Sequence, residues 1–276
     1  MVDHDRSFAG MKYLYPVVSR RAGGVSIGIN LNPNNACNWR CVYCQVPDLT
    51  RGAASAVDWP QFESELTQML DAICHGSYLA EHAPPEARTL KDFAVSGNGE
   101  PTSCPDFERV IRAIGEARVR YGLVDDVKLV LISNGSLVSK PEVQRGLRLL
   151  ANLDGEVWFK LDRGSDVAVR AANGTRVSLS RHLRRLRITA QCCRTWVQTC
   201  WYSRAGEDPL PADVNDYVAC LERALRTGIQ LAGVQLYTLA RKPLLPEGFD
   251  LGALSGVWMS NLAARVAQLG IRVVVS

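Results

Sequence analysis

Short apolar runs alternate with segments of helical periodicity along almost the whole chain. The runs that predict strands are residues 25–31, 93–95, 127–132, 157–161, 195–202, 234–239 and 271–275. Helices are expected from Asp58 and Pro60 through Ile73, after Pro105 and Pro141, and over residues 214–225 and 258–269. Apolar strands separated by amphipathic helices are typical of a parallel sheet covered by helices. The pattern predicts an α/β fold, a partial (βα)6 barrel that resembles part of a TIM barrel.

The strand and helix series is continuous, which bears on domain organisation. A chain of 276 residues could form two domains, but no linker or internal repeat interrupts the alternation. We therefore expect one barrel domain over residues 25–276, with residues 1–24 as an N-terminal extension packed on it. Two segments, Phe8 to Tyr15 and Arg163 to Val177, are candidate lids over the barrel mouth.

Composition narrows the class of protein. With 47% hydrophobic and 22% charged residues, the chain can bury a sizeable core. No apolar run approaches the roughly 20 residues that span a bilayer, and Met1 to Gly10 is charged, so we expect a cytoplasmic protein without a membrane partner. The net charge of +4 is small and does not by itself require a nucleic-acid partner.

Nine cysteines are more than packing in a reducing compartment requires. Cys37, Cys41 and Cys44 have C-x3-C-x2-C spacing in the loop after the first predicted strand. Three thiolates so close together favour a soft metal assembly, and four usually hold a [4Fe-4S] cluster, so three predict a cluster with one open iron. A structural zinc site completed by His75 or His82 is an alternative, although it lacks a second paired ligand set. A coincidental group of thiols is another.

A glycine-rich turn, Gly97 to Thr102, follows the second predicted strand. Glycine lets the backbone approach a ligand closely, and the Glu100 carboxylate can accept a hydrogen bond from an ammonium group. Alone, this segment could equally be a tight turn without a ligand.

Together the two motifs resemble the radical S-adenosylmethionine (SAM) superfamily, with Tyr43 as the aromatic residue before the last cysteine. The resemblance implies that the cysteines hold a [4Fe-4S] cluster, whose open iron takes the amino and carboxylate groups of the methionine moiety of SAM. Reductive cleavage then gives a 5′-deoxyadenosyl radical, which abstracts hydrogen from a substrate. A Gly-Gly-Glu-Pro type motif binds the methionine amino group in that superfamily. Its equivalents here are Gly97, Asn98, Gly99, Glu100 and Pro101, with Asn98 in place of a glycine.

Further polar residues lie at the ends of later strands, where a barrel binds its ligand. By the same resemblance, we expect cofactor contacts from Ser133, Asn134, Lys160, Asp162, Gln198 and Arg241. Lys160 and Asp162 could also merely solvate the barrel mouth, and Arg241 could be a surface residue. Cys104 could be a catalytic thiol or hydrogen donor, or could only pack. Cys192, Cys193, Cys200 and Cys220 could hold a second cluster, but core packing is the more frequent role for such residues.

The substrate class is less well defined. Arg20-Arg21 before Ser26, Lys160 to Asp162, and Val234 to Thr238 leading to Arg241 resemble the branch that contains wyosine-synthase-related Fe-S oxidoreductases and glycyl-radical-enzyme activases. That resemblance and a basic patch, Arg181, Arg184, Arg185 and Arg187 with His182, favour an RNA base as substrate, although such a patch is more often a solvated face.

The alternatives to RNA modification are a glycyl-radical activase, a peptide-modifying enzyme and a non-enzymatic protein with a structural cluster. A merely structural cluster has no use for an ammonium-binding turn at Glu100, so we favour an enzyme. Such an oxidoreductase would need a reductant such as flavodoxin or ferredoxin.

Overall fold

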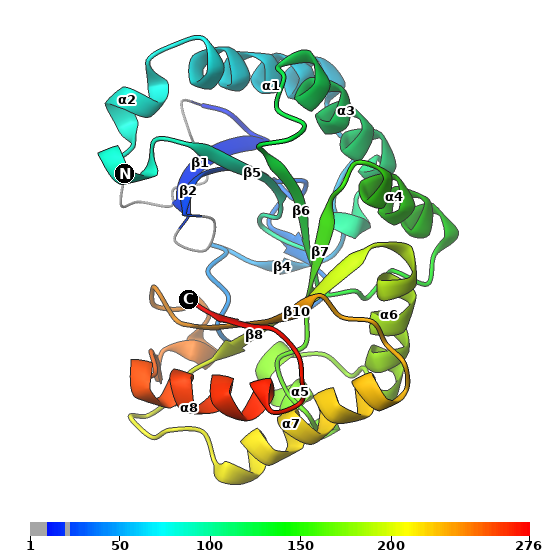
Figure 1. Ribbon diagram of the computed structural model, residues 1–276, viewed down its shortest axis with the longest axis vertical. Helices are drawn as coiled ribbons and strands as arrows, with labels where there is room; N and C mark the ends of the chain where they lie inside the picture. Colours follow the sequence, from blue (N-terminus) through cyan, green and yellow to red (C-terminus); the bar gives the residue numbers. More distant parts are fainter. Residues whose placement is uncertain (1–9, 20–22) are drawn as a thin grey trace.

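The computed structural model, which describes residues 10–19 and 23–276, contains one large sheet with helices around its outer side (Figure 1). Its eight strands run in the order β1-β2-β5-β6-β7-β8-β10-β12, and only β1 is antiparallel to its neighbour. The strands are β1 (Leu14–Ser19), β2 (Gly24–Ile29), β5 (Leu90–Val95), β6 (Lys128–Ser133), β7 (Glu156–Lys160), β8 (Arg194–Trp201), β10 (Gly233–Thr238) and β12 (Val273–Val275). This is a curled α/β sheet of the partial-barrel type, so the predicted fold class is confirmed.

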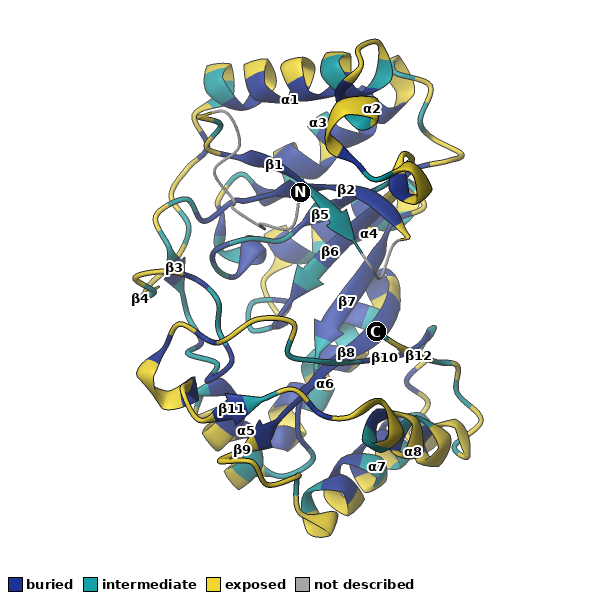
Figure 2. Ribbon diagram, turned by 90° about the vertical axis from the view of Figure 1, so that its left-hand side faces the viewer, coloured by how far each residue is buried: buried dark blue, intermediate teal, exposed yellow. Residues whose placement is uncertain are grey.

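The helices cover the outer face of this sheet. They are α1 (Trp59–Cys74), α2 (Tyr78–His82), α3 (Phe107–Arg120), α4 (Pro141–Asn152), α5 (Asp166–Asn173), α6 (Leu179–Cys192), α7 (Pro211–Arg226) and α8 (Gly256–Ala267). Figure 2 shows exposed residues on the outer sides of α1, α7 and α8, away from the sheet. Two short pairs, β3 (Ala36–Cys37) with β4 (Thr50–Arg51) and β9 (Ser203–Arg204) with β11 (Leu251–Gly252), lie in the loops.

Alternation along the strands separates the core from the barrel interior. On β2, Val25, Ile27 and Ile29 are buried in the main core with residues of the helices. The intervening Ser26 and Gly28 line an interior cavity instead. Small and polar residues on the inner face leave the barrel hollow, and the apolar outer face holds the helices.

Most predicted elements are confirmed within a few residues at their ends. Asp58 caps α1 as expected, since its side chain accepts a hydrogen bond from the Gln61 backbone N–H at 3.3 Å. Residues 14–19, from the predicted extension, add an antiparallel edge strand that the sequence pattern did not reveal. Arg20, Arg21 and the start of the Phe8 to Tyr15 lid candidate lie outside the described residues. Among the helices that are described, none is long and apolar enough to cross a bilayer.

The second lid candidate, Arg163 to Val177, is not a free loop. It contains α5, which begins after the Ser165 cap and ends at Gly174, a left-handed residue with φ of 57°. The backbone N–H groups of Arg40 and Val42 donate to the carbonyls of Asn173 and Ala172 at 3.1 and 2.9 Å. The segment therefore supports the cysteine loop, and the lid expectation is wrong for it.

Candidate functional site

A cavity of about 350 Å³ opens at the carboxyl ends of the parallel strands. The predicted site residues that line it are Cys37, Cys41, Tyr43, Cys44, Gly97, Gly99, Glu100, Asn134, Lys160, Gln198 and Arg241. They come from the loops after β2, β5 and β6 and from the ends of β7, β8 and β10. Carboxyl ends of parallel strands meet at one edge of the sheet, which explains how segments far apart in sequence share one cavity.

The three thiols of the cysteine loop all face this cavity. Burial raises the pKa of Cys37 to about 11 and that of Cys41 to about 12, with Asp162 contributing to the latter. Both are therefore protonated near neutral pH unless a metal displaces the proton. Such thiols are poor free nucleophiles.

The three described thiols do not converge on a site for a single metal ion. Within the described part of the chain, no three His, Cys, Asp or Glu side chains converge where one metal ion could sit. A [4Fe-4S] cluster takes each thiolate on a different iron, so its ligands stand further apart. The zinc alternative has no support from the histidines, since His75 stacks on Tyr121 and His82 on Tyr78, away from the cavity wall.

Asn173, the last residue of α5, fixes the middle of the cysteine loop. Its side-chain amide is buried and donates to Cys41 Sγ at 3.4 Å and to Asp162 Oδ2 at 2.6 Å. Hydrogen bonds to a ligand sulfur orient the ligand and tune a cluster's potential. No local feature of the sequence marks this helix-terminal asparagine as a contact of Cys41, which lies 132 positions earlier.

Asp162 lies behind the cavity wall, where its carboxylate accepts hydrogen bonds from the cysteine loop, α5 and β8. One carboxylate oxygen accepts hydrogen bonds from the Tyr43 hydroxyl and the Asn173 amide, and the other accepts from the Cys200 backbone N–H at 2.8 Å. It is 1% exposed and does not line the cavity. Its observed contacts are thus with the protein, and they tie the cysteine loop to α5 and β8.

Glu100 is buried at the bottom of the turn after β5. Its Oε1 accepts hydrogen bonds from the Thr102 backbone and hydroxyl, at 3.1 and 2.5 Å, and from the Ser133 hydroxyl at 2.7 Å. Its Oε2 accepts from the Asn134 backbone N–H at 2.7 Å. Burial raises the pKa of Glu100 despite these hydrogen bonds. Since a carboxylate oxygen has two acceptor positions, Oε2 can also accept from an ammonium group, whose charge would stabilise the ionised form.

Position 99 requires glycine because residues Asn32 and Ala36 lie very close to its backbone. A Cβ atom there would lie 2.1 Å from the Ala36 carbonyl oxygen and 2.5 Å from the Asn32 side chain. The turn after β5 therefore packs directly on the residue before Cys37, which places Glu100 beside the cysteine loop.

Four of the predicted residues besides Asp162 do not line the cavity. Asn98 donates from Nδ2 to Asn35 Oδ1 at 2.6 Å, and Ser133 donates to Glu100. Pro101 begins a short 3-10 turn, Pro101–Ser103. Cys104 is buried in the main core, with its thiol 3.6 Å from the Ser55 carbonyl, so the structure gives it packing contacts and no access to the cavity.

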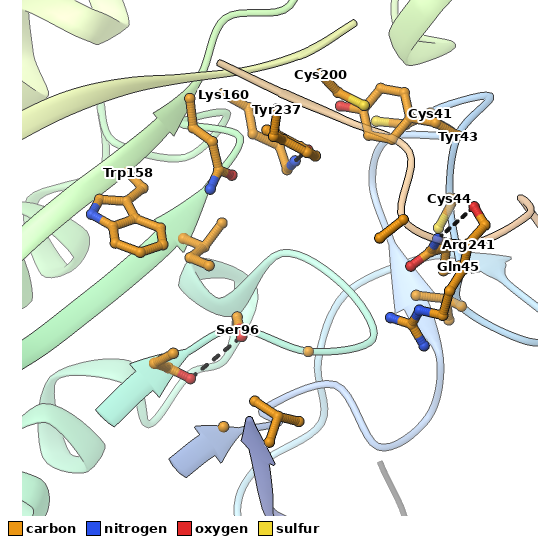
Figure 3. A pocket seen from close by; sticks show the side chains of 18 of the residues that line it. Cys41, Tyr43, Cys44, Gln45, Ser96, Trp158, Lys160, Cys200, Tyr237 and Arg241 are labelled. Carbon is orange, nitrogen blue, oxygen red and sulfur yellow. Dashed lines mark hydrogen bonds between the residues drawn. The ribbon is translucent and has the colours of Figure 1, made fainter. Parts of the chain in front are cut away.

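The side of the cavity away from Cys44 holds residues that the sequence analysis did not select (Figure 3). Trp158 on β7 is directed toward the cavity, with Lys160 between it and Tyr237. The Tyr15 hydroxyl and Ser96 Oγ are 3.2 Å apart on another part of the wall. Strand alternation is the signal that could have found them, because Trp158 lies two residues before Lys160 on the same face.

The basic patch on α6 divides into outward arginines and an inward histidine. Arg181, Arg184 and Arg187 are exposed, whereas His182 is 1% exposed and its Nε2 lies 2.8 Å from the Lys160 carbonyl. The ring contacts Trp39 of the cysteine loop and Phe159, at centroid distances of 5.3 and 4.8 Å. His182 therefore belongs to the packing between α6 and the cysteine loop, and its assignment to the patch is wrong.

Burial of His182 predicts a pH dependence of stability. Desolvation lowers its pKa to about 4 from an ordinary value of 6.5. The unfolded chain binds this proton first as pH falls, so stability is lost between pH 6.5 and 4, by about 3 kcal/mol in total. Urea unfolding at pH 7 and pH 4.5 should show a smaller decrease for His182→Gln than for wild type. Equal decreases would contradict the assignment.

No model of a known protein family matches the chain. A protein named GTPase Obg from Brachyspira hyodysenteriae is 27% identical over 150 residues, 54% of this chain and 19% of that protein. A UPF0026 protein from Helicobacter pylori strain 26695 is 30% identical over 135 residues, 48% of this chain and 38% of that protein. The chain thus matches less than two fifths of the length of these curated relatives.

Solved structures define the fold. A radical SAM methyltransferase from Sphaerobacter thermophilus aligns over 97% of this chain and 78% of its own, with a TM-score of 0.62 and 16% identity. TYW1 with a bound lysine-pyruvate adduct aligns over 88% and 73%, with a TM-score of 0.58 and 18% identity. A spore photoproduct lyase variant aligns over 95% and 76%, with a TM-score of 0.56 and 11% identity. The chain has the partial-barrel fold of these radical SAM structures, as the alternation of strands and helices and the family resemblance led us to expect.

Proposed function

We propose that this chain is a radical SAM enzyme. The observation that carries the proposal is the meeting of Cys37, Cys41, Cys44 and Glu100 on one cavity at the carboxyl edge of the sheet. Thiol ligands for an iron-sulfur cluster and a buried acceptor for an ammonium group stand together there. A cluster with only a structural role would not need the second feature.

In this proposal each residue has a chemical task. The three cysteines hold a [4Fe-4S] cluster, and Glu100, with the backbone of Gly97 and Gly99, receives the amino group of SAM. When bound, the two groups supply reductive cleavage of a sulfonium to a carbon radical. Asn134, which lines the cavity and donates from its backbone N–H to Glu100, would contact the ribose. The barrel wall excludes water and unwanted C–H groups from the reaction.

The proposal includes two partners. The cluster needs an electron from a protein such as flavodoxin or ferredoxin, and the substrate must present a C–H bond within the barrel. An RNA base was favoured by the arginines of α6. This helix packs on the outer side of β8 and beside α4, so its exposed arginines would hold phosphates outside the cavity.

Cleavage of SAM tests the proposed function directly. Wild-type protein, reconstituted anaerobically with iron and sulfide and reduced with dithionite, should produce 5′-deoxyadenosine from SAM, measured by mass spectrometry. Protein without the cluster should produce none. A fully loaded, reduced cluster that yields no 5′-deoxyadenosine above this background would overturn the enzyme proposal in favour of a structural cluster.

A further inference from the structure

The carboxyl-terminal end of α5 holds the cysteine loop on both sides of Cys41. The Arg40 backbone N–H donates to the Asn173 carbonyl at 3.1 Å, and the Val42 backbone N–H donates to the Ala172 carbonyl at 2.9 Å. Between these two hydrogen bonds, the Asn173 side chain donates to Cys41 Sγ at 3.4 Å. The last residue of α5 therefore binds the loop through its backbone and its side chain together.

The residue after α5 fixes the same contact. A Cβ atom at Gly174 would lie 2.4 Å from the Arg40 carbonyl oxygen, so the two backbones touch there. The Arg51 guanidinium donates to the carbonyls of Asn38 and Gly174 at 3.2 and 2.7 Å, and thus connects the two segments a second time. The position of the Asn173 amide against the loop is therefore set by the backbone around it.

The Asn173 amide uses both of its hydrogens in this place. Its side chain is 1% exposed, so protein groups must accept them. Asp162 Oδ2 lies 2.6 Å from the amide nitrogen and takes one hydrogen. Cys41 Sγ and the Tyr43 hydroxyl, each at 3.4 Å, remain for the other. The Tyr43 hydroxyl donates its own hydrogen to Asp162.

A hydrogen bond to a ligand sulfur acts on the reduction potential of a cluster. Reduction adds one electron, and part of the added charge lies on the ligand sulfurs, so an N–H donor to a sulfur stabilises the reduced state more than the oxidised state. Burial of the amide strengthens this effect because the local dielectric is low. The negative charge of Asp162, on the other side of the same amide, has the opposite effect on an electron added near Cys41.

We propose that Asn173 is a positioning residue for the cluster: its amide holds Cys41 as a ligand and raises the reduction potential of the cluster. A higher potential makes the cluster easier to reduce by a protein such as flavodoxin or ferredoxin. The inference rests on the proposed function, because it takes the three cysteines as ligands of a [4Fe-4S] cluster. It concerns a residue outside both the cysteine motif and the cavity wall.

A redox titration of the anaerobically reconstituted protein, followed by the EPR signal of the reduced cluster, tests the inference. Asn173→Ala removes the donor to the sulfur. At the wild-type midpoint potential, we expect the ratio of reduced to oxidised cluster to fall about 3–10-fold, which for one electron is a downward shift of about 30–60 mV.

Val169→Ala is the matched control, because Val169 lies in the same helix and is buried in the main core away from the cysteine loop. It should lower the thermal stability of the protein and leave the ratio within about 1.5-fold of the wild-type value. Iron content and thermal unfolding are measured for every variant.

Two further variants keep the test sharp if Asn173→Ala perturbs folding. Asn173→Asp keeps the shape of the side chain, and its carboxyl shares one proton with Asp162 and offers no N–H to the sulfur, so it should also lower the ratio. Asp162→Asn removes the opposing charge and should raise the ratio. A general loosening of the loop would move the two potentials in the same direction, whereas the inference requires opposite directions.

Each outcome supports or overturns the inference. Loss of iron from both Asn173 variants, with iron retained by Val169→Ala, would support it. An unchanged midpoint in the Asn173 variants at full iron content, or an equal shift in Val169→Ala, would overturn it. A cluster whose potential depends on Asn173, in a protein that makes no 5′-deoxyadenosine, would overturn the proposed reaction alone. Wild-type protein that binds no cluster would overturn both.

Discussion

Cys41→Ala is expected to abolish both cluster binding and the formation of 5′-deoxyadenosine. Cys41 is the middle one of the three proposed cluster ligands, and its sulfur accepts the hydrogen bond from Asn173 at 3.4 Å. Substitution of a residue that hydrogen-bonds to a metal ligand typically lowers the affinity for the metal about 10–100-fold. Substitution of the ligand Cys41 itself should therefore lower the affinity for the cluster about 100-fold or more. Iron and sulfide content after anaerobic reconstitution and 5′-deoxyadenosine by mass spectrometry measure the two effects.

Cys74→Ala is the matched control. This thiol is half-buried at the end of α1 and does not line the cavity, so the variant should retain the wild-type iron content and product yield. Cys37→Ala and Cys44→Ala should behave as Cys41→Ala does. A Cys41→Ala protein that binds a complete cluster and still cleaves SAM would contradict the assignment of the three ligands.

The sequence predicted the order of strands and helices well because the fold depends on local patterning. Apolar runs such as residues 127–132 and the stripe from Val214 to Leu225 form β6 and α7 with small differences at their ends. The cysteine motif and the turn after β5 were also accessible, because their spacing and position relative to strands are local properties. Both lie on the predicted edge of the sheet.

What the sequence could not supply is which polar residues face the cavity. Lys160 and Asp162 are two residues apart, yet the first lines the cavity and the second is buried behind it, where the loop after β7 turns toward α5. Trp158 was read only as an apolar strand residue, although it faces the hollow interior. Such orientations depend on contacts with segments far away in sequence, which no local pattern encodes.

His182 and Asn173 show the same limit. A histidine among arginines suggests a basic surface, but α6 turns this ring inward against Trp39. Asn173 ends α5, which lies within the lid candidate Arg163 to Val177. Both residues support the cysteine loop, and the surroundings of the loop therefore had to be learned from the structure.

Asp162→Ala is expected to lower the free energy of unfolding by about 3–5 kcal/mol. The substitution leaves the Tyr43 hydroxyl, the Asn173 amide and the Cys200 backbone N–H without their acceptor, and each such buried donor costs about 1–3 kcal/mol. Asp162→Asn keeps the volume and one acceptor oxygen, so a smaller loss of about 2 kcal/mol should follow. Urea unfolding of the cluster-free proteins at pH 7 measures both.

Asp208→Ala, at an exposed position, is the control and should change the free energy of unfolding by less than about 0.5 kcal/mol. Because Asp162 connects the cysteine loop to α5 and β8, Asp162→Ala should also decrease the iron retained after reconstitution. A substitution that destabilises another part of the barrel by a similar amount should not decrease the iron content. A core variant of similar cost, such as Leu147→Ala in α4, separates the two effects. If both variants retained iron equally, Asp162 would stabilise the fold without positioning the cluster ligands.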